Sequence, residues 1–107
     1  MEKVEFVNLT PHTLNIHSNG NVTVIKPSNI IARVSTQYKK VDTMGGVEIF
    51  QCVYGEVEGL PAPKDGVVFV VSGLVKTTLL HRQDVMSPGE LIRDESGKPI
   101  GCNGLRR

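Results

Sequence analysis

The sequence lacks a charge excess and a long apolar run, and each absence excludes a class of protein. Its 107 residues carry 12 Lys and Arg against 11 Asp and Glu, for a formal net charge of +1. Binding to nucleic-acid phosphates needs a basic stripe, so no nucleic acid, and no sequence-specific contact with one, is expected. No apolar stretch approaches the about 20 residues that cross a bilayer, so no association with a membrane is expected.

Cysteine and histidine are also scarce, with 2 and 3 residues. The cysteines form no Cys-x-x-Cys pair and the histidines show no spacing such as His-x-x-x-His, so we predict neither a metal site nor a cofactor. The N-terminus has no apolar segment typical of a signal peptide, which predicts a cytoplasmic protein with reduced thiols. Cys52 follows an apolar strand pattern and is expected in the core, whereas Cys102 precedes glycine-rich sequence and is expected to be more exposed.

The residues that are present indicate β-structure in one domain, residues 1–107. Apolar and polar residues alternate from 3 to 7, which predicts a first strand. Asn19-Gly20 is the strongest hairpin signal, because both positions tolerate a positive φ. A two-residue type I′ turn there places Leu14 opposite Ile25, and it places His12 on the face of Leu14, towards the core.

The rest of the chain predicts further strands and one short helix. Val67–Val71 is apolar without alternation, which is typical of a central strand covered on both faces. Ser72 follows as a candidate N-cap for a helix with apolar residues at Leu74, Val75 and Leu79. Other expected segments are a short strand at 30–35, a polar loop at 37–46, a strand at 47–54, a proline-rich connector at 59–66 and a hairpin around 94–98. We therefore expect an α+β fold with a small, mostly antiparallel β-sheet or partly open barrel and one short helix, with all-β as the alternative.

The first candidate site is the polar patch Asn8-Leu9-Thr10-Pro11-His12, which lies between two apolar segments. In an extended segment Asn8, Thr10 and His12 share a face, where an amide, a hydroxyl and an imidazole form a hydrogen-bonding edge for a polar ligand. The alternative is a structural corner, in which Thr10-Pro11 shapes a bend and His12 satisfies a buried carbonyl group.

Two further candidates lie in the second half of the chain. Ser72 and Gly73 stand where a buried strand enters a helix, a place where backbone N–H groups can bind an anion, although helix capping explains the pair equally well. Arg82 and Asp84 share a face if extended, and they form either a ligand-binding fork or a local ion pair. A helix of ten residues would separate Ser72 from Arg82 by about 15 Å, too far for one small ligand.

A set of short motifs resembles a group of small uncharacterised proteins of bacteriophages, prophages and some bacteria. The resemblance spans nearly the whole chain and departs from the group at Gly73, where alanine is common. It implies a phage or prophage origin, hence the cytoplasm of a bacterial host, and no particular activity. The motifs are Asn8-Leu9-Thr10-Pro11-His12, Gly55-x-Val57-x-Gly59-Leu60-Pro61, Val70-Val71-Ser72-x-Leu74-Val75, Arg82-x-Asp84-Val85-x-x-Pro88 and Arg93-Asp94-x-x-Gly97-x-x-Ile100.

Three classes of function remain open from the sequence. The first is a non-enzymatic phage-type accessory protein that binds a small polar or nucleotide-like ligand, for example to sequester a host nucleotide signal, or that binds a host protein. The second is a small enzyme acting on a phosphate or glycosidic bond with His12 as acid or base and Arg82 as anion clamp, although no partner for His12 can be named. The third is a virion structural or assembly component. A small core with an exposed sheet edge also predicts a homo-oligomer.

Overall fold

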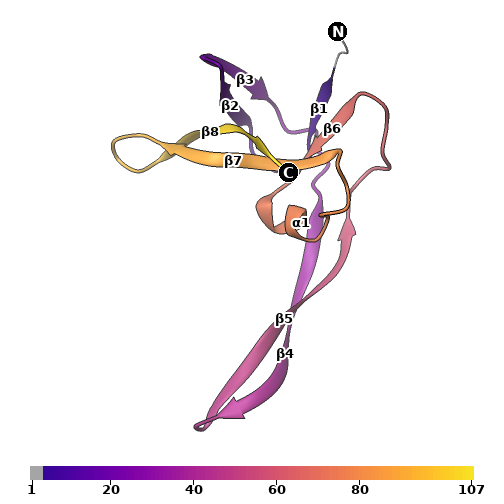
Figure 1. Cartoon of the computed structure of the whole chain (residues 1–107), viewed down its shortest axis with the longest axis vertical. Coiled ribbons are helices and arrows are strands. Elements are labelled where there is room, and N and C mark those ends of the chain that lie inside the picture. Colours follow the sequence, from indigo (N-terminus) through magenta and orange to yellow (C-terminus); the bar gives the residue numbers. More distant parts are fainter. Residues whose placement is uncertain (1–3) are drawn as a thin grey trace.

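The computed structural model describes residues 4–107, which form eight strands and one short helix (Figure 1). Lys3, which the sequence placed in the first strand, lies outside the described residues. The elements are β1 (Glu5–Asn8), β2 (Leu14–Ser18), β3 (Asn21–Ile25), β4 (Arg33–Met44), β5 (Val47–Glu58), β6 (Val67–Val70), α1 (Gly73–Thr77), β7 (Val85–Arg93) and β8 (Pro99–Arg106). The fold is therefore mostly β with one short helix, as expected.

Six of these strands form one mixed sheet in the order β1-β6-β7-β8-β2-β3. The hairpins β2–β3 and β7–β8 are antiparallel, whereas β1–β6, β6–β7 and β2–β8 pair in parallel over shorter stretches. A bridge between Asn8 and Pro27 joins the end of β1 to the segment after β3, so the two outer strands of the sheet approach each other. The sheet is consequently a nearly closed barrel.

The N-terminal hairpin has the predicted register. Asn19 and Gly20 have φ values of 51° and 79°, as a type I′ turn requires, and Leu14 pairs with Ile25. The prediction for His12 is wrong, because β2 begins at Leu14 and the His12 side chain is exposed rather than directed to the core. The cause is the bend before it, which turns the backbone carbonyl of His12 inward instead of its side chain.

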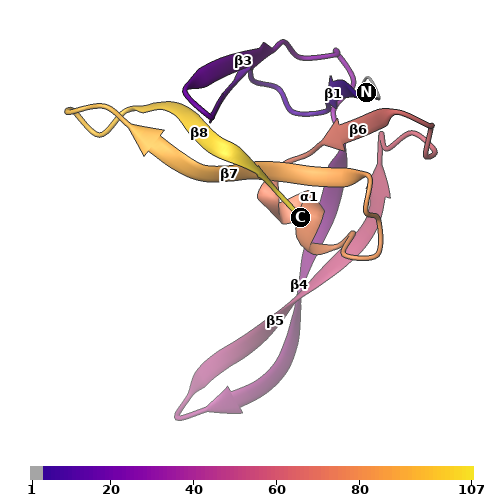
Figure 2. The ribbon, with the colours of Figure 1, turned by 45° about the horizontal axis from the view of Figure 1, so that its top comes forward.

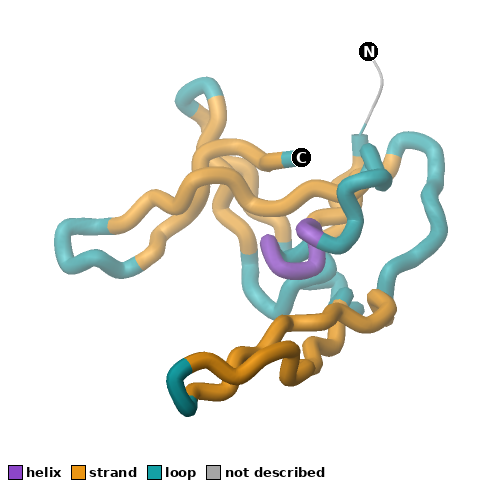
Figure 3. Tube along the Cα trace, turned by 60° about the horizontal axis from the view of Figure 1, so that its bottom comes forward, coloured by secondary structure: helices purple, strands orange, loops and turns teal. Residues whose placement is uncertain are grey.

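The predicted central strand is confirmed as β6, which lies between β1 and β7. Ser72 caps the following helix as predicted, since its hydroxyl accepts a hydrogen bond from the Val75 amide at 3.4 Å. Val75 packs with Phe69 and Val85 in the main core, beneath the six-stranded sheet. Figure 3 shows α1 between this sheet and the β4–β5 hairpin. No helix within residues 4–107 is long and apolar enough to cross a membrane.

The largest error of the sequence analysis concerns residues 37–46, which were expected to be a polar loop. They belong to a hairpin of two 12-residue strands, β4 and β5, joined at Gly45-Gly46. We call this hairpin, Arg33–Glu58, the arm. It projects from the body, so that the molecule measures 58 × 39 × 22 Å (Figures 1 and 2). Polar residues can occupy these strands because the outer arm is exposed on both faces, so no alternation of buried and exposed positions marks the strands.

Both cysteine predictions are wrong, and in opposite senses. Cys52 lies on β5 of the arm and is exposed. Cys102 lies on β8, which runs between β7 and β2, and only 3% of it is exposed. Its thiol donates a hydrogen bond to the Gly104 carbonyl at 3.4 Å. Position within the sheet, rather than local apolar pattern, decides the burial of both thiols.

Candidate functional site

The polar patch at residues 8–12 folds into a hydrogen-bonded corner around Asn8, which is 1% exposed. The Asn8 Nδ2 atom donates to the carbonyls of His12 at 2.7 Å and Ile25 at 3.1 Å. Its Oδ1 atom accepts from the Thr10 amide at 2.9 Å and from the Thr10 hydroxyl at 2.6 Å. All four hydrogen-bonding positions of the amide are thus used inside the protein.

This corner connects β1 to the far edge of the sheet. The Asn8 carbonyl accepts from the Ser28 amide at 3.0 Å and from its hydroxyl at 2.8 Å, and the Leu9 carbonyl accepts from the Ala32 amide at 3.0 Å. Together with the Asn8–Ile25 bond, these contacts hold the end of β1 against the segment that leaves β3. The geometry therefore favours the structural corner for Asn8 and Thr10, and their role in binding a ligand stays a prediction.

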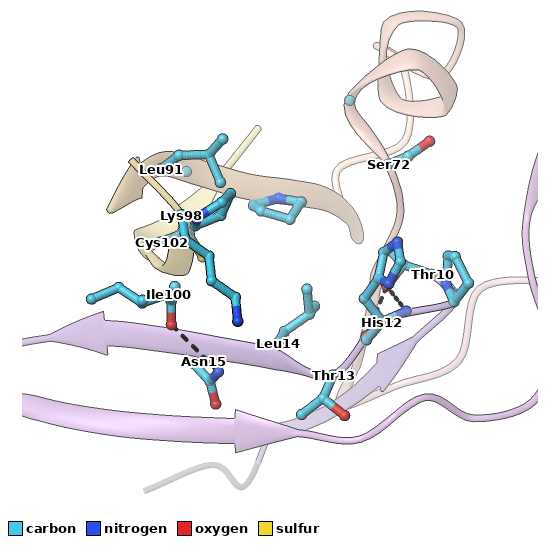
Figure 4. A pocket seen from close by; sticks show the side chains of 16 residues that line it. Thr10, His12, Thr13, Leu14, Asn15, Ser72, Leu91, Lys98, Ile100 and Cys102 are labelled. Carbon is cyan, nitrogen blue, oxygen red and sulfur yellow. Dashed lines mark hydrogen bonds between the residues drawn. The ribbon is translucent and has the colours of Figure 1, made fainter. Parts of the chain in front are cut away.

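A groove of about 800 Å³ opens beside the corner, between the N-terminal segment and the β7–β8 hairpin (Figure 4). It combines residues from distant parts of the sequence. The lining residues are Thr10, Pro11, His12, Thr13, Leu14, Asn15, Ser72, Gly73, Pro88, Gly89, Leu91, Lys98, Pro99, Ile100, Gly101 and Cys102. The volume falls within the range of small-molecule sites, about 300–1,000 Å³.

The groove combines charged and apolar groups. Figure 4 shows Lys98 on the same side as the apolar wall of Leu91 and Ile100, facing His12, with Leu14 between Lys98 and His12. Both wall residues remain accessible, at 52% and 45% exposure. The arrangement offers cationic and hydrogen-bonding contacts at the rim and an apolar surface beside them.

Lys98 is positioned by the turn that precedes it. The Asp94 carboxylate accepts hydrogen bonds from the Ser96 amide and the Lys98 amide, each at 2.9 Å, and from the Ser96 hydroxyl at 2.6 Å. These bonds, with that from the Ser96 hydroxyl the largest, lower the pKa of the Asp94 carboxyl from its usual value. The turn therefore holds its backbone in one conformation, and the Lys98 side chain extends from a defined point.

Ser72 and Gly73 line the same groove as His12, so the structure brings the first two candidate sites together. The Ser72 hydroxyl is engaged as the helix cap, but the residue is exposed and borders the groove. The helix ends at Thr77, much shorter than the ten residues considered from the sequence. Its role here is to turn the chain, which places residues 72 and 73 opposite the β7–β8 hairpin.

Arg82 and Asp84 lie outside the groove and form the local ion pair. The Arg82 Nε and Nη2 atoms each donate to a different carboxylate oxygen of Asp84 at 2.8 Å, and Nη2 also donates to the Pro61 carbonyl at 3.3 Å. The hydrogen bond from Arg82 lowers the pKa of the Asp84 carboxyl, against the opposing effect of burial. The pair ties the β5–β6 connector to the loop before β7, and a ligand role for either residue stays a prediction.

Lys76, which the sequence analysis did not single out, supports the same loop. Its side chain is buried, at 5% exposure, and its ammonium group donates to the carbonyls of Leu79 at 3.2 Å and Arg82 at 3.4 Å. These carbonyls follow the short helix, so a cation is favourable there. The contacts make Lys76 a structural residue of this loop.

Two groove residues were missed from the sequence, Lys98 and Asn15. Lys98 was seen only as part of a turn, and no local signal shows which way a turn lysine points. Asn15 donates from Nδ2 to the Ile100 carbonyl at 3.5 Å across the β2–β8 junction, a parallel pairing that sequence spacing does not reveal. Both residues become visible as candidates only once the hairpins are placed together.

In the described part of the chain, no three His, Cys, Asp or Glu side chains lie together as metal ligands would. The candidate site is the groove itself, in which the imidazole of His12 and the ammonium group of Lys98 lie on facing sides. Comparisons of the chain with protein-family models, with curated proteins and with solved structures gave no match.

Proposed function

We propose that the protein is a non-enzymatic accessory protein that binds a small anionic ligand in the groove between His12 and Lys98. The observation that carries the proposal is the convergence of these two side chains from opposite ends of the sequence on one groove of ligand size. An ammonium group is a donor without acceptor capacity, and a histidine supplies a donor at either ring nitrogen. Both are suited to the oxygens of a phosphate or carboxylate.

The apolar wall narrows the ligand class to molecules that carry a flat or apolar part beside their charge. A nucleotide has this composition, since its phosphates fit the cationic rim and its base fits against Leu91, Ile100 and Pro99. Sequestration of a host nucleotide signal in a bacterial cytoplasm is the concrete form of the proposal. The resemblance of the chain to phage and prophage proteins supports that setting.

The lining supports binding better than turnover. Acid–base catalysis by His12 needs a second group that accepts or donates a proton on the opposite side of the reacting bond. Among the described residues that line the groove none is a carboxylate, and Asp84 is already paired with Arg82. We therefore propose that a bound ligand is released chemically unchanged.

The test has two stages. Mass spectrometry of small molecules released by denaturation, after purification from phage-infected bacteria, identifies a retained ligand, and calorimetry with a panel of mono- and dinucleotides measures its affinity. A hydrogen bond to a charged group contributes about 1.5–3 kcal/mol. Lys98→Ala should therefore weaken binding by roughly 10- to 100-fold, and His12→Ala by a similar or smaller factor.

The matched control is Lys64→Ala, which removes an exposed ammonium group from the β5–β6 connector, away from the groove. It should bind the ligand as the wild type does. The proposal is overturned if no nucleotide binds, or if the Lys98 and His12 variants bind as tightly as the control. If instead the wild type converts the ligand to a product and His12→Ala does not, the protein is an enzyme in which His12 acts as acid or base.

A further inference from the structure

The arm contributes no residue to the groove, so the proposed ligand binding gives it no role. An isolated two-stranded hairpin is at best marginally stable in water, yet this hairpin consists of two strands of 12 residues each and projects from the body (Figure 1). Large apolar side chains on it are exposed to solvent. They are Tyr38 (75%), Val41 (51%), Met44 (63%), Val47 (61%), Ile49 (36%), Phe50 (51%), Val53 (44%) and Tyr54 (42%).

The strand register divides these side chains between two faces. Residues directly opposite each other in an antiparallel pair share a face, and Tyr38 pairs with Cys52, Lys40 with Phe50, and Thr36 with Tyr54. Tyr38, Phe50, Cys52 and Tyr54 therefore lie together on what we call the aromatic face. Met44, Val47, Ile49 and Val53 alternate with them and lie on the opposite, aliphatic face.

The aromatic face continues from the core of the body. An extra residue in β5 shifts the register between the Thr36–Tyr54 and Val34–Val57 pairs, so that Val34 and Val57 fall on the aromatic face. Both valines pack against the main core cluster. One apolar stripe thus begins in the core and runs outward along the arm, and within residues 4–107 only its inner end is covered.

We propose that the aromatic face of the arm packs against the same face of a second copy of the chain, around a two-fold axis that runs along the arm. The axis direction follows from charge. On the aromatic face, β4 carries the cation Lys40 and β5 carries the anion Glu48, and the two lie 3.7 Å apart within one arm. A two-fold axis along the arm stacks β4 on the partner's β5, whereas an axis across the arm would stack β4 on β4 and bring like charges together.

The area is compatible with a dimer of this form. The outer arm, residues 36–44 and 47–54, is about 30 Å long and, with two strands, about 10 Å wide, or about 300 Å² of free face per copy. A specific dimer buries about 1,200–2,000 Å² in total, so the two arm faces supply about a third to a half of that area. Arms that point the same way also bring the two bodies side by side, which adds contact area. Two-fold packing is closed, unlike edge-to-edge pairing of β4 with β5, which would continue into fibres.

The first test is the mass of the full chain in solution, measured by sedimentation equilibrium over a range of concentrations. We expect twice the chain mass of 11.7 kDa at tens of micromolar. Truncating a well-packed aromatic anchor weakens an interface by about tenfold or more, so the double variant Tyr38→Ser/Phe50→Ser should raise the dissociation constant about 100-fold. The matched control Met44→Ser/Ile49→Ser removes two apolar side chains from the aliphatic face and should dimerise as the wild type does.

Cys52 provides a second test that does not depend on how a variant folds. In the proposed dimer the two Cys52 side chains face the same interface, separated by one inter-strand and one inter-sheet spacing, so a bis-maleimide with a spacer of about 10 Å should join them. Cys102 is buried and should not contribute. We expect a covalent dimer from the wild type and none from Cys52→Ser.

Three results would overturn the proposal. One is a wild-type chain that stays monomeric at hundreds of micromolar, in which case a different protein would have to cover the aromatic face. Another is an aliphatic-face variant that dissociates as readily as the aromatic-face variant. The third is a dimer in which Cys52 cannot be cross-linked, since the two copies would then meet elsewhere. None of these measurements involves the groove, so the proposed ligand-binding function stands or fails separately.

Discussion

Replacement of Asn8 by alanine should destabilise the protein, because it removes the side chain that makes four of the hydrogen bonds of the 8–12 corner. The change removes the partners of the Thr10 amide and the Ile25 carbonyl, both in buried positions. A buried polar group left without a partner costs roughly 1–3 kcal/mol. We therefore expect Asn8→Ala to lower the free energy of unfolding by about 4 kcal/mol, a large share of the about 5–15 kcal/mol typical of a domain.

The measurement is urea unfolding followed by far-UV circular dichroism. Fluorescence would be misleading, because the sequence has no tryptophan and both tyrosines lie on the arm. The control is His12→Ala, whose side chain is exposed and whose hydrogen bonds are made by the backbone. That variant should stay within about 0.5 kcal/mol of the wild type.

Asn8→Asp adds a pH dependence with a definite sign. A carboxylate would face the carbonyls of His12 and Ile25, so its pKa in the folded protein should lie above its unfolded value. The destabilisation is then full above the folded pKa, and it shrinks as the pH falls and the protonated acid donates one hydrogen bond. If Asn8→Ala lowers stability by less than about 1 kcal/mol, the corner does not close the sheet, and the reasoning fails.

Three further outcomes follow from other parts of the structure. Arg82 lowers the pKa of the Asp84 carboxyl in the folded state, so the pair stabilises the fold above the unfolded pKa near 3.9 and loses this effect as the pH falls through the folded pKa. In Asp84→Asn, the free energy of unfolding should therefore depend less on pH in the acid range. An unchanged dependence would contradict the assignment of the ion pair. Gly101→Ala should lower the free energy of unfolding by about 2 kcal/mol or more, since a Cβ there would overlap the Asn15 carbonyl at 2.6 Å. If the variant unfolds in urea at the same concentration as the wild type, β2 and β8 can separate at little cost. A maleimide should label Cys52 within the dead time of mixing at low protein concentration and Cys102 only on unfolding, and equal labelling rates would refute the burial of β8.

The sequence predicted those elements that local chemistry specifies. The Asn19-Gly20 hairpin, the C-terminal hairpin around 94–98 and the cap at Ser72 all depend on side chains that act on their own turn. The central strand Val67–Val70 was recognisable because burial on both faces removes the alternation of polar residues. In each of these cases the information lies within a few residues of the feature.

Failures occurred where a feature depends on distant parts of the chain or on a missing neighbour. Residues 37–46 of the arm were predicted as a loop because strands exposed on both faces need no apolar alternation. The strand predicted at 47–54 is part of β5, but Cys52 was placed in the core because that strand is rich in apolar residues, although it is exposed. The groove depends on parallel pairing of β2 with β8, which unites residues near 16 with residues near 102. His12 could be proposed as a ligand contact, but its partner Lys98 could not, since nothing local relates the two.

The parallel pairing of β1 also determines the order in which the protein can assemble. Glu5 pairs with Val67, so β1 lacks its neighbour in the sheet until β6, 62 residues further along the chain, has been synthesised. Contacts between residues so far apart form slowly, because a long loop must close first. The arm, whose strands are joined by a two-residue turn, requires no such closure and can form within microseconds. We therefore expect the arm of a nascent chain to pair transiently before the Asn8 corner closes the sheet, and contact between the arms of two chains translated close together would stabilise a hairpin that is marginal by itself.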